Sequence, residues 1–136
     1  MVVEVRGFSH VGIRVHDMHR SAEFYRLLGF EFIAGPLGPE PVAILRHAAG
    51  IEINLVLNAH QDCQVNLLMD VPEKHPGFTH IALRVADVAT ARESLEASGL
   101  SLSGSMTFPS GAAAIFLRDP DGNVVELNDV PDNMYG

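Results

Sequence analysis

The sequence is poor in cysteine, in positive charge and in long apolar runs, and each shortage excludes a class of protein. The single cysteine, Cys63, allows neither a disulfide within the chain nor a zinc site of several thiolates, and it suits a reducing cytoplasm. Nine Lys and Arg residues against 17 Asp and Glu give a net charge of −8, which would repel DNA or RNA. No apolar run approaches the roughly 20 residues of a membrane span, and the first residues lack a secretory-signal pattern. We therefore expect a cytoplasmic protein that binds neither nucleic acid nor membranes.

The most informative feature of the sequence is an internal repeat. Residues 7–17 read GFSHVGIRVHD, and residues 77–87 read GFTHIALRVAD. With this offset of 70, eight of the 23 residue pairs between 7/77 and 29/99 are identical. Two prolines between residues 70 and 76 break any regular element there. The repeat predicts two related modules, residues 1–70 and 71–136, that together make one domain of 136 residues.

Each module has the pattern of a βαβββ unit, so the fold class predicted is α+β with a pseudo-twofold repeat. Apolar and polar residues alternate in the first strand of each module, and a helix with an aspartate before it and a glycine after it follows. The sequence DPDG at 119–122 predicts a tight turn between the last two strands. The predicted strands are 8–15, 30–34, 42–47 and 51–57 in the first module, and 78–85, 101–106, 112–117 and 123–128 in the second.

Four potential metal ligands lie on the strand faces that point away from the apolar stripes. These residues are His10, Glu52, His80 and Glu126. Imidazole and carboxylate groups suit a divalent ion such as Zn, Ni, Co, Mn or Fe. A histidine or glutamate on such a face is usually only solvated. The equivalent repeat positions of His10 and His80 favour a metal site instead.

The paired βαβββ units and these motifs resemble the vicinal oxygen chelate superfamily, which includes glyoxalase I, extradiol dioxygenases and bleomycin-binding proteins. The strongest local marker is FLRDPDGNVVEL at 116–127, followed by the two GF[ST]H strands. The resemblance implies two sheets that form a cupped, barrel-like site. It also implies one divalent metal ion per site, with His10, His80 and Glu126 as ligands.

The remaining ligand from the first module has two candidates. Matching IEI at 51–53 to the family pattern selects Glu52, whereas matching Gly50 to Gly122 places Asn54 opposite Glu126. Both residues share a strand face, so alternation does not decide between them. A carboxylate is the stronger ligand, so Glu52 is the predicted metal ligand and Asn54 a predicted substrate-binding residue.

The resemblance implies a small substrate that chelates the metal through two adjacent oxygens. In a glyoxalase I-like reaction, Glu126 or Glu52 would move a proton between neighbouring carbons through an enediolate. Arg14, four residues after His10, matches an arginine that the glyoxalase I pattern uses to hold glutathione.

Two alternatives stay open, as does the assembly. With only His10, His80 and Glu126 bound, the ligand set is a facial triad suited to an Fe(II) dioxygenase of the extradiol type. A non-catalytic, drug-binding protein of the bleomycin-resistance type is the other alternative. Open sheet edges in such modules often pair between chains, so we expect a homodimer.

Overall fold

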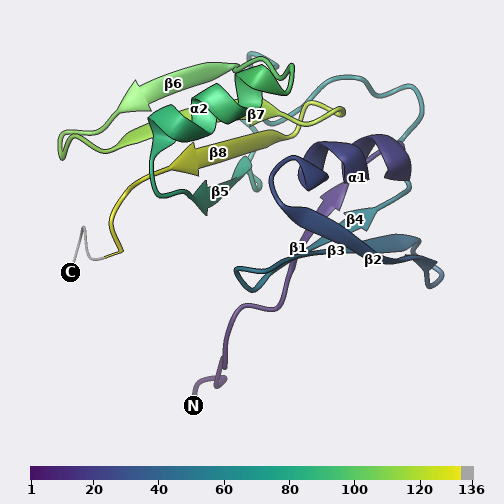
Figure 1. The fold of residues 1–136 in the computed structure, drawn as a ribbon. Helices are drawn as coiled ribbons and strands as arrows, with labels where there is room; N and C mark the ends of the chain where they lie inside the picture. The colour runs from purple at the N-terminus through teal and green to yellow at the C-terminus, as the bar shows by residue number, and fades with distance from the viewer. Residues whose placement is uncertain (133–136) are drawn as a thin grey trace. The chain divides into compact units, whose positions relative to one another are not determined.

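The computed structural model describes residues 1–132 and divides into two compact units, Met1–Cys63 and Gln64–Gly136. Each unit contains one βαβββ module (Figure 1). The predicted α+β class and the two-module organisation are therefore confirmed. No helix within the described residues is long and apolar enough to cross a membrane.

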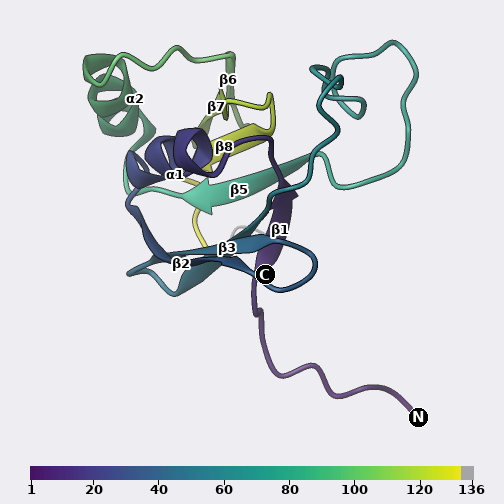
Figure 2. The same ribbon diagram turned by 90° about the vertical axis from the view of Figure 1, so that its right-hand side faces the viewer.

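The first module is a four-stranded sheet with one helix. Its elements are β1 (Val11–Arg14), α1 (Met18–Arg26), β2 (Phe30–Leu37), β3 (Val42–His47) and β4 (Ile51–Val56). The strand order is β1-β4-β3-β2, and β1 is parallel to β4 while the other pairs are antiparallel (Figure 1). Figure 2 shows β2 and β3 side by side in this sheet.

The second module repeats this topology. Its elements are β5 (His80–Arg84), α2 (Val88–Ala97), β6 (Gly104–Thr107), β7 (Ala113–Arg118) and β8 (Val124–Asn128). The strand order is β5-β8-β7-β6, again with one parallel pair, β5 and β8. The predicted strands 8–15 and 101–106 are wrong at their starts, because β1 begins only at Val11 and β6 only at Gly104.

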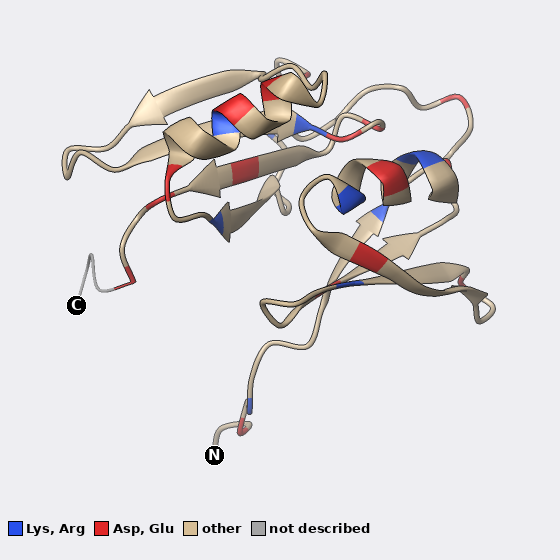
Figure 3. Ribbon diagram, viewed as in Figure 1, with Lys and Arg blue, Asp and Glu red and all other residues tan. Residues whose placement is uncertain are grey.

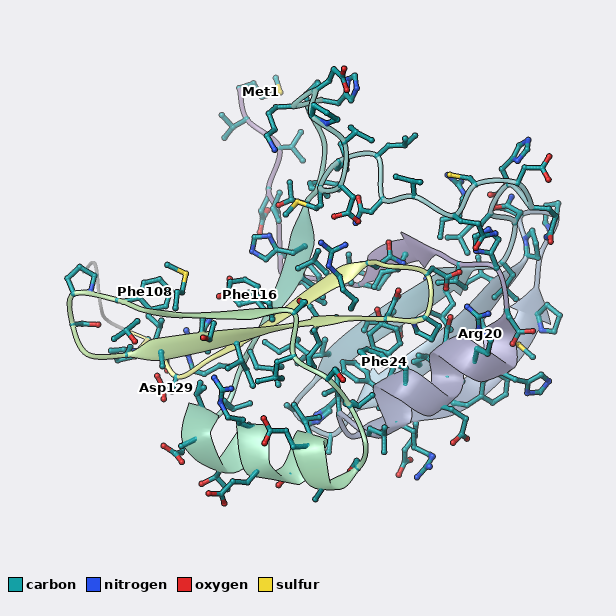
Figure 4. The ribbon with its side chains drawn as sticks, turned by 90° about the horizontal axis from the view of Figure 1, so that it is seen from above. Met1, Arg20, Phe24, Phe108, Phe116 and Asp129 are labelled. Atoms are coloured by element: carbon teal, nitrogen blue, oxygen red, sulfur yellow. The ribbon has the colours of Figure 1, made fainter. Side chains whose placement is uncertain are left out.

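Each helix covers the apolar face of its own sheet. On α1, Phe24 and Tyr25 are buried, and the Tyr25 ring packs edge-on against Phe30 with ring centroids 6.0 Å apart. Phe24 is buried, whereas Arg20 of the same helix is exposed (Figure 4). Both α1 and α2 contain basic and acidic residues (Figure 3). This one-sided burial leaves the opposite strand faces for polar residues.

The helix ends follow the sequence prediction. Asp17 and Asp87 accept hydrogen bonds from the backbone N–H groups of Arg20 and Thr90, each at 2.8 Å. Gly29, which follows α1, has φ +93°, a conformation that favours glycine.

Residues 64–70, between β4 and β5, are bound to the second module. These contacts explain why the boundary between the two units follows Cys63 rather than residue 70. The Asn66 side chain donates to the Gly122 carbonyl at 3.0 Å. Asp70 accepts two hydrogen bonds from the Arg118 guanidinium, at 2.7 and 2.8 Å. These hydrogen bonds from Arg118 hold the pKa of Asp70 below its usual range.

Candidate metal centre

The second module brings His80 and Glu126 together. Ala82 pairs with Glu126 in the parallel register of β5 and β8, so His80 lies diagonally across from Glu126 on the same face. His80 Nε2 is 3.4 Å from Glu126 Oε1, and the Glu126 side chain is only 13% exposed. Two ligand atoms that each bind a metal at about 2.0–2.2 Å stand about 2.8–3.1 Å apart in octahedral geometry and about 3.3–3.6 Å apart in tetrahedral geometry. The separation of this pair therefore fits two ligands of one ion.

Neighbouring polar groups fix the orientation of both side chains. The Thr79 hydroxyl and His80 Nδ1 are 2.8 Å apart, which leaves Nε2 directed at Glu126. Asn128 Nδ2 donates to Glu126 Oε2 at 2.7 Å, which leaves Oε1 for His80 or an ion. Neither Thr79 nor Asn128 is among the site residues predicted from the sequence. The hydroxyl residue before each repeated histidine, Ser9 or Thr79, was the available signal.

The first module also pairs its histidine with a carboxylate, but in a different way. His10 Nδ1 lies 3.9 Å from Glu52 Oε2, and the same nitrogen is 2.9 Å from the Ser9 hydroxyl. The second oxygen of Glu52 accepts a hydrogen bond from Arg46 Nε at 3.1 Å. Glu52 thus lies nearest His10 Nδ1, whereas Glu126 lies nearest His80 Nε2. Glu52 also has a cationic partner, Arg46.

Strand register gives Asn54 the position that Glu126 has in the second module. Gly12 pairs with Asn54 in β1 and β4, and Ala82, which is the repeat equivalent of Gly12, pairs with Glu126. Asn54 Oδ1 is buried, and it has no hydrogen-bond partner among the residues that the structure describes. A buried oxygen of this kind is rare without a bound group to satisfy it.

Arg14 is held by two neighbouring side chains. Its Nε donates to Asn58 Oδ1 at 2.9 Å, and one terminal nitrogen lies 3.5 Å from Glu40 Oε1. Its repeat equivalent, Arg84, donates to the Val130 carbonyl at 2.7 Å and pairs with Asp132. Each arginine therefore contacts residues that follow the last strand of its module. Glu40 partly compensates the charge of Arg14.

No group of three or more His, Cys, Asp or Glu side chains in residues 1–132 is placed to hold a metal ion. Each module supplies one histidine–carboxylate pair, and these pairs contain all four predicted metal ligands: His10 with Glu52, and His80 with Glu126.

A model of the Glyoxalase/Bleomycin resistance protein/Dioxygenase superfamily matches residues 7–127, a range that includes every candidate site residue. The chain belongs to this superfamily. A curated relative, the lactoylglutathione lyase of Haemophilus influenzae, is 28% identical over 124 residues, which are 87% of this chain and 88% of that protein.

Solved structures of superfamily proteins share the fold. A glyoxalase family protein from Enterococcus faecalis superposes with a TM-score of 0.75 at 22% identity, covering 90% of this chain and 97% of that one. The fosfomycin resistance protein FosX from Listeria monocytogenes has a TM-score of 0.72 at 17% identity, covering 96% and 97% of the two chains. That FosX structure is a mutant in complex with Mn(II) and a dihydroxypropylphosphonic acid.

Proposed function

We propose that this chain is a divalent-metal-dependent enzyme of the glyoxalase type that binds a small substrate through two adjacent oxygens. The proposed ligands are His10, His80, Glu126 and one oxygen from β4. The observation that supports this most directly is the His80–Glu126 pair, whose facing atoms are 3.4 Å apart. The buried, unpartnered oxygen of Asn54 on β4 further supports a bound cation.

The relatives support the substrate class. The Haemophilus influenzae relative is a lactoylglutathione lyase, and the FosX structure contains Mn(II) with a dihydroxy compound. Both point toward a small substrate with oxygens on neighbouring atoms. Among the reactions of the superfamily, we therefore propose lyase or isomerase chemistry, in which a proton moves between adjacent carbons.

Different side chains of this protein have different proposed roles in such a reaction. A bound divalent ion would act as a Lewis acid toward negative charge that develops on the substrate oxygens. Glu126 is the proposed general base as well as a proposed ligand: Asn128 holds its Oε2, so Oε1 would serve the ion and the substrate proton in turn. Arg14 is the proposed contact for an anionic group of the substrate, which would compete with Glu40 for the guanidinium.

A dioxygenase is the second candidate, and the position of Asn54 favours it. With a neutral amide from β4, the remaining ligands are two histidines and one carboxylate. This composition is the facial triad of non-haem Fe(II) oxygenases.

The proposed base can be tested by replacing Glu126 with Gln in metal-loaded protein. The amide keeps the shape of the side chain but cannot accept the proton. We expect kcat for lactoylglutathione formation from methylglyoxal and glutathione to fall by about 10²–10⁴-fold. Oxygen uptake with a catechol, measured on iron-loaded protein, tests the dioxygenase.

If the Glu126→Gln variant retained wild-type kcat, the assignment of the base would be wrong. If neither reaction occurred and the wild type bound no metal, a drug-binding protein would be the better assignment.

The assembly and location belong to the same proposal. β1 and β5 are edge strands, and Phe8 and Phe78, just before them, are 74% and 97% exposed. Open edges beside exposed aromatic rings favour pairing with a second copy of the chain. We propose a cytoplasmic homodimer, whose mass can be checked by light scattering.

A further inference from the structure

The identity of the β4 ligand determines how much charge the proposed metal centre carries. Glu52 and Asn54 both lie on the strand face of His10, so strand alternation admits either residue. Three independent observations within the modules separate them.

The first observation is strand register. In the second module, Val124 pairs with His80. In the first module, Val11 pairs with Ile53, so the residues one step before them, His10 and Glu52, lie opposite each other. Glu52 therefore corresponds to Val124. Val124 is buried and apolar. Asn54 corresponds to Glu126, the residue in contact with His80. The repeat therefore places Asn54 at the ligand position.

The second observation concerns the nitrogens of the two histidines. Glu126 faces His80 Nε2, whereas Glu52 lies nearest His10 Nδ1, which the Ser9 hydroxyl also contacts. Since Ser9 and Thr79 contact the same nitrogen in their respective modules, Nε2 is the nitrogen left for an ion in both. Glu52 stands on the other side of the imidazole ring.

The third observation is the set of partners that each candidate has. Arg46 contacts Glu52 Oε1 at 3.1 Å, so the charge of Glu52 is already compensated by a cation. Asn54 Oδ1 is buried without a hydrogen-bond partner among the described residues. An amide oxygen in that state carries a desolvation penalty that a cation would remove.

We propose that Asn54, through its amide oxygen, is the β4 ligand, and that the centre therefore contains one carboxylate, Glu126. This inference rests on the proposed function. A divalent ion with two neutral imidazoles, one neutral amide and one carboxylate keeps a net charge of +1. The centre then favours a substrate or intermediate that brings negative charge on its two adjacent oxygens over a neutral diol, and Glu52 acts outside the ligand set as the partner of Arg46.

The test compares three variants with the wild type: Asn54→Leu, Asn54→Asp and Glu52→Gln. The affinity for Mn²⁺ is measured by competition with a chelator. The affinity of the Mn²⁺-loaded protein for acetohydroxamate, a bidentate anion, is measured by calorimetry. The Tm of the metal-free proteins shows whether each variant folds.

We expect Asn54→Leu to weaken Mn²⁺ binding by at least about tenfold while the Tm of its metal-free form is equal to or above that of the wild type, because the leucine removes an unsatisfied buried oxygen. Asn54→Asp should bind Mn²⁺ about tenfold more tightly and acetohydroxamate about tenfold more weakly, since the added carboxylate neutralises the centre. Glu52→Gln should bind Mn²⁺ within about threefold of the wild type.

Loss of Mn²⁺ binding in Glu52→Gln, with wild-type affinity in Asn54→Leu, would overturn the inference and make Glu52 the ligand. Unchanged affinities in all variants would also overturn it. In both cases the wild type still binds the metal, so the proposed function would survive. A wild type that takes up no Mn²⁺, Ni²⁺, Zn²⁺, Co²⁺ or Fe²⁺ would overturn both.

Discussion

Thr79 directly precedes the candidate ligand His80, and the Thr79 hydroxyl orients the His80 imidazole. Because Thr79 Oγ1 is 2.8 Å from His80 Nδ1, the Thr79→Val variant removes the contact and preserves the shape of the side chain. We expect Thr79→Val to weaken metal binding by about tenfold, the low end for groups that orient a metal ligand. Chelator competition measures this affinity.

Thr79→Ser is the matched control, since it keeps the hydroxyl and should bind metal like the wild type. Equal metal affinities in the Val and Ser variants would show that the hydroxyl does not orient His80.

The sequence predicts most residues of the candidate site and is insufficient where alternation of side chains is the only guide. The offset of 70 predicts His10 and His80 as ligands, and the family pattern around DPDG predicts Glu126. The sequence pattern could not decide whether Glu52 or Asn54 is the ligand, because residues two apart on a strand share a face. The partners of Arg14 were also hidden, since Glu40 and Asn58 come from loops that only the folded sheet brings together.

At the scale of elements, the glycine after each helix offers a pair of matched substitutions. Gly29 and Gly99 have φ +93° and +84°, so alanine at either position costs about 1–2 kcal/mol in backbone strain. A Cβ at Gly29 would also lie 2.7 Å from His47 Nε2, whereas a Cβ at Gly99 would meet nothing within 4 Å. We expect Gly29→Ala to lower the free energy of unfolding more than Gly99→Ala, as measured by urea titration.

Equal losses in the two alanine variants would mean that His47 moves aside without cost. His47 packs edge-on against Phe30, with ring centroids 5.2 Å apart, so its displacement would disturb the core of the first module.

The segment that joins the modules makes a pH-dependent contact with the second module. Arg118 holds the pKa of Asp70 below its usual value of 3.8, so this ion pair stabilises the fold above that pH and is lost as the pH falls through the lowered pKa. We expect Asp70→Asn to lower the Tm at pH 7, and the difference from wild type to shrink below about pH 3.8.

Asp62→Asn, which changes an exposed aspartate of the first module, is the charge-matched control. A Tm difference between Asp70→Asn and the wild type that stayed constant from neutral to acidic pH would contradict the role given to Arg118.

The boundaries of elements were harder to predict than their order. The βαβββ order follows from hydrophobic periodicity, caps and turns, and the structure agrees with it. The division between modules does not follow from the prolines near residue 70, because Asn66 and Asp70 bond to the turn and strand of the second module. Such long-range contacts leave no local pattern in the sequence.

For the whole molecule, we propose that His10 and His80, one from each module, bind the same divalent ion. The first measurement is the metal content of the purified, dialysed protein, beside the His10→Ala and His80→Ala variants. We predict about one metal ion per site in the wild type and loss of that ion in both variants, with their folds retained by circular dichroism. A wild type without metal that takes up none on reconstitution, or two variants that keep it, would contradict a metal ion bound by His10 and His80.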